Sequence, residues 1–410
     1  MDLRRKLERL NAAGLSPPSE DPDKSALLAG LRRKMAEILA KAPPPVPRAD
    51  PAQTSLPFVE EETAAGLLCR RHLVLPPSHH VGRMPVDAAR AASPDLLALL
   101  ALDPTLSGCR FDRALFLDTE TSGLGGGAGV VAFLVGVAWF DAEQRLNVEQ
   151  VLLRQMSEER ALLAWLRQRV EAAELYVTYN GKSFDLPLLA TRYVMNREPA
   201  LPPRKHLDLV HVARRLHRNR LGGCRLVMLE SDVLGFERGP DVDGGEIPAR
   251  YAHFLRTGDE EALRMVVEHN AWDVASMAAL VGLYGEPLEL LPAQDLACLA
   301  RTLKRGKAFE LAHEVAEQAV QRGAGLDGVR VRGEIAKARG DRDAALLDFE
   351  HLSREVDDPA VRLELAKLYE HHVKAPDKAL EQVLAGTGED EPALVRRRSR
   401  LEKKASRGSS

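Results

Sequence analysis

Two carboxylates, Asp118 and Glu120, are the side chains whose type and spacing most directly suggest chemistry, within the segment FLDTETSGL. Residues two apart on a strand project from the same face. Two carboxylates there repel each other, and their burial is costly unless a cation lies between them. They end the apolar run 115–117, where an acidic pair would otherwise face the edge of a core. A solvated acidic surface is the ordinary alternative for an isolated pair of this kind.

A third carboxylate, Asp185, follows the Tyr179-Asn180-Gly181 turn in VTYNGKSFDLPLLATRY. It stands just ahead of Pro187 and an apolar helical run. Asp is a favoured helix N-cap residue and Pro favours the first helical turn, so a capping role is the structural alternative. The two roles are compatible, because a carboxylate at a helix start can also bind a metal.

The fourth carboxylate is Asp273, on the predicted helix DEEALRMVVEHNAWDVASMAALVGLY. Apolar residues at helical spacing define the buried face of this helix. His269 lies four positions before Asp273, so the two side chains are neighbours on one side of the helix. An ordinary surface or interface pair is the alternative interpretation.

The three elements together favour phosphodiester hydrolysis. Four carboxylates can hold two oxygen-seeking cations about 3.5–4 Å apart, where one activates water and the other stabilises the leaving oxygen. The imidazole of His269 titrates near neutral pH and could accept the proton of that water. The expected cofactors are therefore two divalent cations, Mg²⁺ or Mn²⁺.

The segments FLDTETSGL, YNGKSFD and HNAWD resemble the three exonuclease motifs of the DEDD superfamily. The stretches GLGGGAGVVAFLVGVAWF and LESDVLGFERGPDVDGGEIPARYAHFLRTGD resemble the YprB-like predicted exonucleases, which pair such a domain with tetratricopeptide repeats. The resemblance covers about residues 60–285 and, more loosely, 293–385. It implies a 3′–5′ exonuclease acting on ends of single-stranded DNA or RNA.

The resemblance also implies roles for individual residues. Asp118, Glu120, Asp185 and Asp273 would be the metal ligands, and His269 the general base. One departure concerns the spacing: His269 precedes Asp273 by four positions, as the tyrosine does in the Tyr-type group, rather than by five. His269 could therefore position water instead of accepting its proton.

Candidate substrate contacts flank the acidic residues. Thr121 and Leu124 follow the acidic pair, where Leu124 could wedge against a terminal base or simply pack in its loop. Asn180 and Lys182 precede Asp185 and could contact a phosphate. The segment 204–225 carries seven Arg or Lys against one acid, which could form the wall of a nucleic-acid groove or a solvated helix face.

The elements that must position these residues predict an α/β fold of the ribonuclease H-like type, a mixed sheet flanked by helices. Within the expected domain 58–290, three consecutive strands form an antiparallel meander and are followed by a helix, a fourth strand and further helices. Residues 1–57 are expected to be a charged helical or disordered arm that ends in a Pro-rich linker.

After residue 290 the strands end. Residues 291–390 read as helix pairs with alanine at packing positions, like degenerate tetratricopeptide repeats of about 34 residues, or as a plain helical bundle. These repeats could bind a protein partner. The segment 391–410 is basic and is expected to be a disordered tail.

Composition limits the class of protein. The 410 residues carry a net charge of −3, which argues against a protein that coats nucleic acid non-specifically. Four scattered cysteines without metal-ligand spacing favour reduced thiols in a cytoplasmic protein, and no segment reaches the length of a membrane span. The competing functions are a non-catalytic nucleic-acid-binding scaffold and a structure-selective endonuclease on the same fold.

Overall fold

The computed structural model of the protein describes residues 56–123, 127, 129–285 and 291–408. The predicted N-terminal arm, apart from its last two residues, and Leu124 lie outside these ranges. Within them, no helix combines the length and the apolar character that crossing a lipid bilayer requires. All four cysteines are free thiols.

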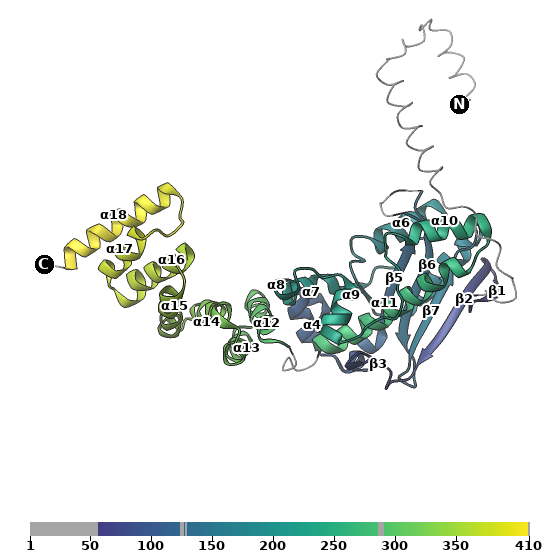
Figure 1. Ribbon diagram of the computed structural model, residues 1–410, viewed down its shortest axis with the longest axis horizontal. Coiled ribbons are helices and arrows are strands. Elements are labelled where there is room, and N and C mark those ends of the chain that lie inside the picture. The colour runs from purple at the N-terminus through teal and green to yellow at the C-terminus, as the bar shows by residue number, and fades with distance from the viewer. Residues whose placement is uncertain (1–55, 124–126, 128, 286–290, 409–410) are drawn as a thin grey trace, which may run out of the picture. The chain divides into compact units, whose positions relative to one another are not determined.

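A seven-stranded mixed sheet forms the centre of the predicted nuclease domain (Figure 1). Its order is β1-β2-β7-β6-β5-β8-β9. The strands are β1 (Val59–Thr63), β2 (Gly66–Leu75), β5 (Ala114–Thr121), β6 (Ala132–Phe140), β7 (Leu146–Leu152), β8 (Leu175–Thr178) and β9 (Lys205–Asp208). As predicted, β5, β6 and β7 form an antiparallel meander, and β8 and β9 extend it in parallel from β5. A separate two-stranded sheet pairs β3 (His80–Val81) with β4 (Met84–Pro85).

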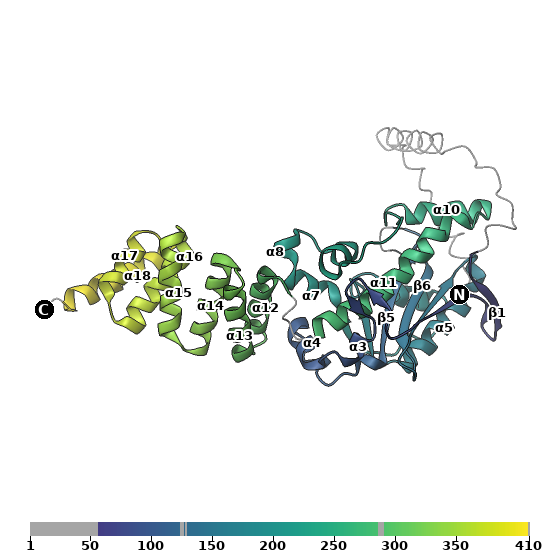
Figure 2. The same cartoon turned by 60° about the horizontal axis from the view of Figure 1, so that its bottom comes forward.

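Helices cover this sheet. They are α3 (Ala88–Ala91), α4 (Pro94–Ala101), η1 (Pro104–Leu106), η2 (Phe111–Arg113), η3 (Met156–Glu158), α5 (Glu159–Ala172), α6 (Asp185–Met195), α7 (Leu209–Leu216), α8 (Arg218–Leu221), α9 (Leu226–Leu229), η4 (Glu230–Leu234), α10 (Ile247–Thr257) and α11 (Glu261–Gly285). The long helix α11 runs beside β5, β6 and β7 (Figures 1 and 2). A mixed sheet flanked by helices confirms the predicted α/β class.

Side chains alternate along β5 between two hydrophobic clusters. Leu115 and Leu117 pack with residues of α5, whereas Ala114 and Phe116 pack with the second half of α11. Alternate residues of a strand share a face. Asp118 and Glu120 follow Ala114 and Phe116 in this alternation, so they lie on the side of the sheet that α11 covers.

The C-terminal region is entirely helical within residues 291–408. Its elements are α12 (Ala293–Arg305), α13 (Phe309–Gln321), α14 (Gly325–Arg339), α15 (Arg342–Glu355), α16 (Pro359–Leu368), η6 (Tyr369–Val373), α17 (Pro376–Leu384) and α18 (Glu391–Gly408). The first helices of successive pairs begin at Ala293, Gly325 and Pro359, close to the period of about 34 residues expected for tetratricopeptide repeats. Whether these pairs are true tetratricopeptide repeats stays a prediction.

Residues 391–408 of the predicted disordered tail form the helix α18, so the prediction was wrong for this part of the chain. Leu401 is buried against the neighbouring helices. Arg400 and Lys404 bind the buried carboxylate of Glu370 at 2.7 and 2.8 Å. The basic run therefore has an anionic partner inside the fold, which its charge alone does not reveal.

A buried polar link joins α12 to the nuclease domain. His217 donates or accepts at both ring nitrogens: Nδ1 lies 2.8 Å from Asp295 Oδ2, and Nε2 lies 3.0 Å from the Tyr284 hydroxyl. Arg220 binds both oxygens of Asp295. Apolar residues of α12, including Leu296, join the same hydrophobic cluster as the second half of α11. The helical region therefore begins inside the core of the preceding domain.

Removal of the Asp295 carboxylate should destabilise the protein strongly. Asp295→Ala leaves the fully buried His217 and the partly buried Arg220 without their shared anion, and loss of one partner of a buried pair typically costs about 3–5 kcal/mol. Urea unfolding measures this change. Asp327→Ala is the control, because its pair with Arg301 is exposed and should contribute less than about 1 kcal/mol. Equal losses in the two variants would contradict a stabilising link.

Candidate metal centre

The acidic pair lies on β5 at the position where α11 crosses it. Asp118 is paired with Gly136 of β6, and Glu120 with Leu134. A register shift follows Glu120, so the strand irregularity begins directly after the second acid. Glu120 is buried and Asp118 is partly buried.

Gly136 permits the close approach of α11 to the sheet. A Cβ atom at this position would overlap the side-chain amide of Asn270. Asn270 is fully buried, and its Nδ2 donates to Asp118 Oδ2 at 2.8 Å. Its Oδ1 accepts from Gln150 Nε2 at 2.9 Å, which fixes the orientation of the amide. Gln150 also donates to the backbone carbonyl of Val267 at 2.8 Å, so strand β7 holds α11 in place.

Asp185 is the first residue of α6, and its side chain is buried. The capping alternative does not hold, because the N-cap position belongs to Phe184 and no side chain there caps the helix. Asp185 Oδ1 instead accepts a 2.5 Å hydrogen bond from the hydroxyl of Thr119 on β5. This bond ties the start of α6 to the strand that carries the acidic pair.

Helix α11 brings His269 and Asp273 to the same place. One ligand atom from each of Glu120, His269 and Asp273 lies within 4.8 Å of the other two. His269 Nε2 is 3.5 Å from Asp273 Oδ2. Two of the four predicted carboxylates, Glu120 and Asp273, are thus brought together with the histidine, and His269 and Asp273 do not form an isolated surface pair.

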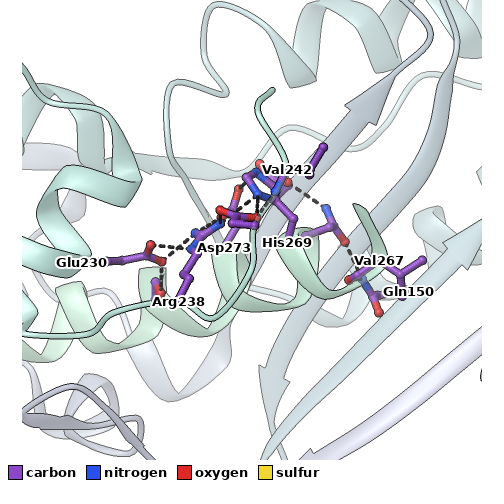
Figure 3. A network of polar contacts seen from close by, with 11 residues as sticks. Gln150, Glu230, Arg238, Val242, Val267, His269 and Asp273 are labelled. Carbon is purple, nitrogen blue, oxygen red and sulfur yellow. Dashed lines mark hydrogen bonds and ion pairs between the residues drawn. The ribbon is translucent and has the colours of Figure 1, made fainter. Parts of the chain in front are cut away.

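An arginine that the sequence did not single out contacts this group. The side chain of Arg238 is 3% exposed and binds Glu230 through two bonds of 2.6 and 2.7 Å (Figure 3). It also donates to Asp273 Oδ1 and, at 3.2 Å, to Asp241 Oδ2. Asp241 in turn lies 2.7 Å from His269 Nδ1. The segment 236–242 therefore places the guanidinium of Arg238 next to Asp273 and the carboxylate of Asp241 next to His269.

The carboxylates of the cluster repel one another. Burial raises the pKa of Asp118 well above its usual range, and repulsion from Asp273, Glu120 and Asp185 adds to it. The hydrogen bond from Asn270 acts in the opposite direction without restoring an ordinary value. The four acids are therefore one electrostatic unit.

The same effect extends to the neighbouring acids. Burial raises the pKa of Glu120 to about 8, although His269 and Arg238 favour its charged form. Burial also raises the pKa of Asp185 to about 6, against the hydrogen bond from Thr119. For His269, burial lowers the pKa, but Asp273, Glu120 and Asp241 outweigh it and the net shift is upward.

A cavity of about 400 Å³ opens beside the acids. Asp118, Asp185 and Thr121 line it, together with Phe184, whose side chain is 60% exposed. Phe184 was not among the predicted substrate contacts. Its position directly before Asp185 gave no signal of exposure, because Leu117, directly before Asp118, is fully buried.

The turn that carries two further predicted substrate contacts, Asn180 and Lys182, is bonded to Asp208. Asn180 and Lys182 are not among the described residues that line the cavity, and their backbone N–H groups donate to Asp208 at 2.7 and 3.0 Å. Asn180 adopts the left-handed conformation, with φ of 70°. Their roles in substrate binding stay predictions.

Part of the basic segment 204–225 serves the fold. Arg204 donates to the carbonyls of Val170 and Glu171, and Arg215 donates to the carbonyl of Leu100. Arg220 donates to the buried carboxylate of Asp295. The side chains still exposed to solvent are Lys205, Arg214, Arg218 and Arg225. The groove prediction therefore rests on these four residues.

The chain is similar to several known proteins. Residues 115–284 match the RNase H superfamily. The uncharacterized protein YprB of Bacillus subtilis (strain 168) is 34% identical over 305 residues, which cover 68% of this chain and 71% of that protein. The family B DNA polymerase of the hyperthermophilic archaeon Pyrobaculum calidifontis is 15% identical with a TM-score of 0.34, over 55% of this chain and 29% of the polymerase chain. The superfamily match confirms the predicted ribonuclease H-like fold.

The raised carboxyl pKa values predict an unusual pH dependence. A carboxyl group whose pKa is higher in the folded protein than in the unfolded chain stabilises the fold through its protonated form. This stabilisation is fully present below the unfolded pKa of about 4 and is lost as pH rises through the pKa of the folded state. In EDTA, the melting temperature should therefore fall as pH rises through the values of about 6 for Asp185 and about 8 for Glu120.

Binding of Mn²⁺ should reverse this loss, by about 2.7 kcal/mol at a concentration 100 times Kd. Asp118→Asn should flatten the metal-free profile and remove most of the Mn²⁺ effect, while the exposed Asp232→Asn should change neither. Thermal melting between about pH 5 and 9 measures both. A metal-free melting temperature that rises with pH would contradict the proposed electrostatic strain.

Proposed function

Because the chain belongs to the YprB-like family and carries a ribonuclease H-like domain, we propose that it is a metal-dependent 3′–5′ exonuclease that hydrolyses single-stranded DNA or RNA. The observation that carries the proposal is the cluster of Asp118, Glu120, Asp185 and Asp273, in which the acids repel one another while Arg238 pairs with Asp273. Such an arrangement is costly for stability and is typical of a functional site.

The donor set fits hard divalent cations. Carboxylate oxygens are the ligands that Mg²⁺ and Mn²⁺ prefer, and the four acids would hold two of these ions. When bound, the ions would activate water and stabilise the leaving oxygen of the phosphodiester. Raised carboxyl pKa values in the metal-free protein fit this interpretation, because a bound cation favours the charged form of each acid.

Three of the four acids have a partner that holds one of their oxygens. Asn270 donates to Asp118, Thr119 to Asp185, and Arg238 to Asp273. Each of these bonds occupies one carboxylate oxygen and leaves the other for a metal. In this proposal the hydrogen bonds preorganise the ligands, so that little reorientation is needed when cations and substrate bind.

Phe184 supports single-stranded ends as the substrate. Bases of single strands stack on exposed aromatic rings without sequence preference, and Phe184 presents its ring at the cavity beside Asp185. A duplex end would first have to be unpaired before a base could stack there. The helical region 291–408 contributes no group to the centre in this proposal, and we expect it to bind a protein partner.

Nuclease activity should depend on a divalent metal ion and on the carboxylate of Asp118. Asp118→Asn removes charge from the metal-binding group and should lower the rate on labelled single-stranded DNA and RNA by at least about 10²-fold in Mn²⁺, because metal contributes several kcal/mol of transition-state stabilisation. Asp259→Asn is the matched control, because Asp259 is a partly buried carboxylate outside the metal-binding group and asparagine keeps an oxygen that can accept from the Glu261 N–H.

Linear strands labelled at either end and circular strands separate the alternatives. An exonuclease leaves circles intact, whereas an endonuclease cuts them. Intact linear substrates with every metal tested would favour a non-catalytic scaffold instead.

Loss of the Phe184 ring should weaken binding of the strand end. Stacking contributes about 1–3 kcal/mol per base, so Phe184→Ala should raise KM by about 10-fold while Phe184→Tyr retains most of the affinity. Steady-state kinetics on a short single-stranded oligonucleotide measures both. An unchanged KM in the Ala variant would mean that the end binds elsewhere.

A further inference from the structure

The orientation of His269 is set by Asp241. Asp241 Oδ1 lies 2.7 Å from Nδ1, and Arg238 Nη1 lies 3.0 Å from the same nitrogen. Nδ1 has a single in-plane position for a hydrogen bond, and the carboxylate is the closer partner. Arg238 also donates to Asp241 at 3.2 Å. We assign the hydrogen of Nδ1 to the bond with Asp241, which leaves the lone pair of Nε2 on the opposite side of the ring when the imidazole is neutral.

That lone pair points into the acidic group. Nε2 is 3.5 Å from Asp273 Oδ2, and Glu120 offers an oxygen within 4.8 Å of both residues. Arg238 engages the other oxygen of Asp273, Oδ1. Asp273 is thus held with Oδ2 turned toward the histidine (Figure 3). One oxygen of Glu120, one oxygen of Asp273 and one ring nitrogen of His269 thus lie within 4.8 Å of one another.

We propose that His269 Nε2 is a direct metal ligand, sharing one divalent cation with Glu120 and Asp273, and that Asp241 is the residue that positions it. The inference rests on the proposed function and adds a nitrogen to its four-carboxylate ligand set. A histidine that binds a metal typically donates its second ring N–H to a carboxylate, which is the arrangement of His269 and Asp241.

The ligand role differs from a general-base role in its consequence for metal choice. Carboxylate oxygens suit both Mg²⁺ and Mn²⁺, but the harder Mg²⁺ accepts an imidazole nitrogen less readily than the transition metal Mn²⁺ does. A nitrogen ligand therefore gives this site a preference for Mn²⁺ over Mg²⁺. A general base, by contrast, leaves metal affinity unchanged when it is removed.

The experiment is electron spin echo envelope modulation of Mn²⁺ bound to the full-length protein, which detects ¹⁴N nuclei coordinated to the ion. Wild type should show ¹⁴N modulation, and His269→Ala should lose it. The control is His253→Ala, because His253 on α10 pairs with Asp259, which follows that helix, at 3.2 Å and outside the metal-binding group. That variant should keep the wild-type spectrum.

Affinities measured by calorimetry give a second readout. Loss of a supporting carboxylate typically lowers metal affinity by about 10–100-fold, so Asp241→Asn should weaken Mn²⁺ binding by this factor and His269→Ala by at least as much. The effect on Mg²⁺ should be smaller in both variants. Asp259→Asn, the carboxylate of the control pair, should bind both ions as wild type does.

The outcomes are distinguishable. Bound Mn²⁺ without ¹⁴N modulation, or modulation that persists in His269→Ala, would overturn the ligand role and leave the proposed nuclease centre standing. Absence of Mn²⁺ binding in wild type would overturn both. If His269→Ala does not fold, wild type with ¹⁵N-labelled histidine replaces it: a spectrum unaltered by the label rules out a histidine ligand.

Discussion

The close contact between α11 and the sheet at Gly136 is the constraint on which the rest of the centre depends. Only a residue without a side chain lets Asn270 reach across β6 to Asp118. The same approach brings His269 and Asp273 to Glu120. A larger residue at Gly136 would push the helix outward and separate the two halves of the ligand set, even though no ligand had been changed.

Much of the centre could be predicted from local patterns, because those patterns are set by short-range geometry. Period-two alternation placed Asp118 and Glu120 on one face, and helical spacing placed His269 beside Asp273. The antiparallel meander followed from three apolar runs with short connections. Residue type was informative here because burying a carboxylate beside a core strand is costly unless a cation or a hydrogen-bond donor compensates its charge.

The features that escaped prediction depend on contacts between distant segments. Arg238 and Asp241 lie in a Gly- and Pro-containing stretch without periodicity, so nothing local shows that they meet α11. The edge strand β1 escaped because VEEET is too acidic to resemble a core strand, although it pairs with β2 along its length. The helix α18 escaped because its basic residues have their partner, Glu370, in another helix.

The bond between Asp118 and Asn270 joins residues 152 positions apart. The entropy lost in closing so long a loop is large, and it is lost before the contact can stabilise the chain. Long-range pairing of this kind therefore slows folding. On the ribosome, β5 is synthesised well before α11, and its acidic face stays uncovered in the meantime. A nascent chain therefore has no assembled acidic centre, and a cell making this protein would meet the proposed cleavage activity only after the domain has closed.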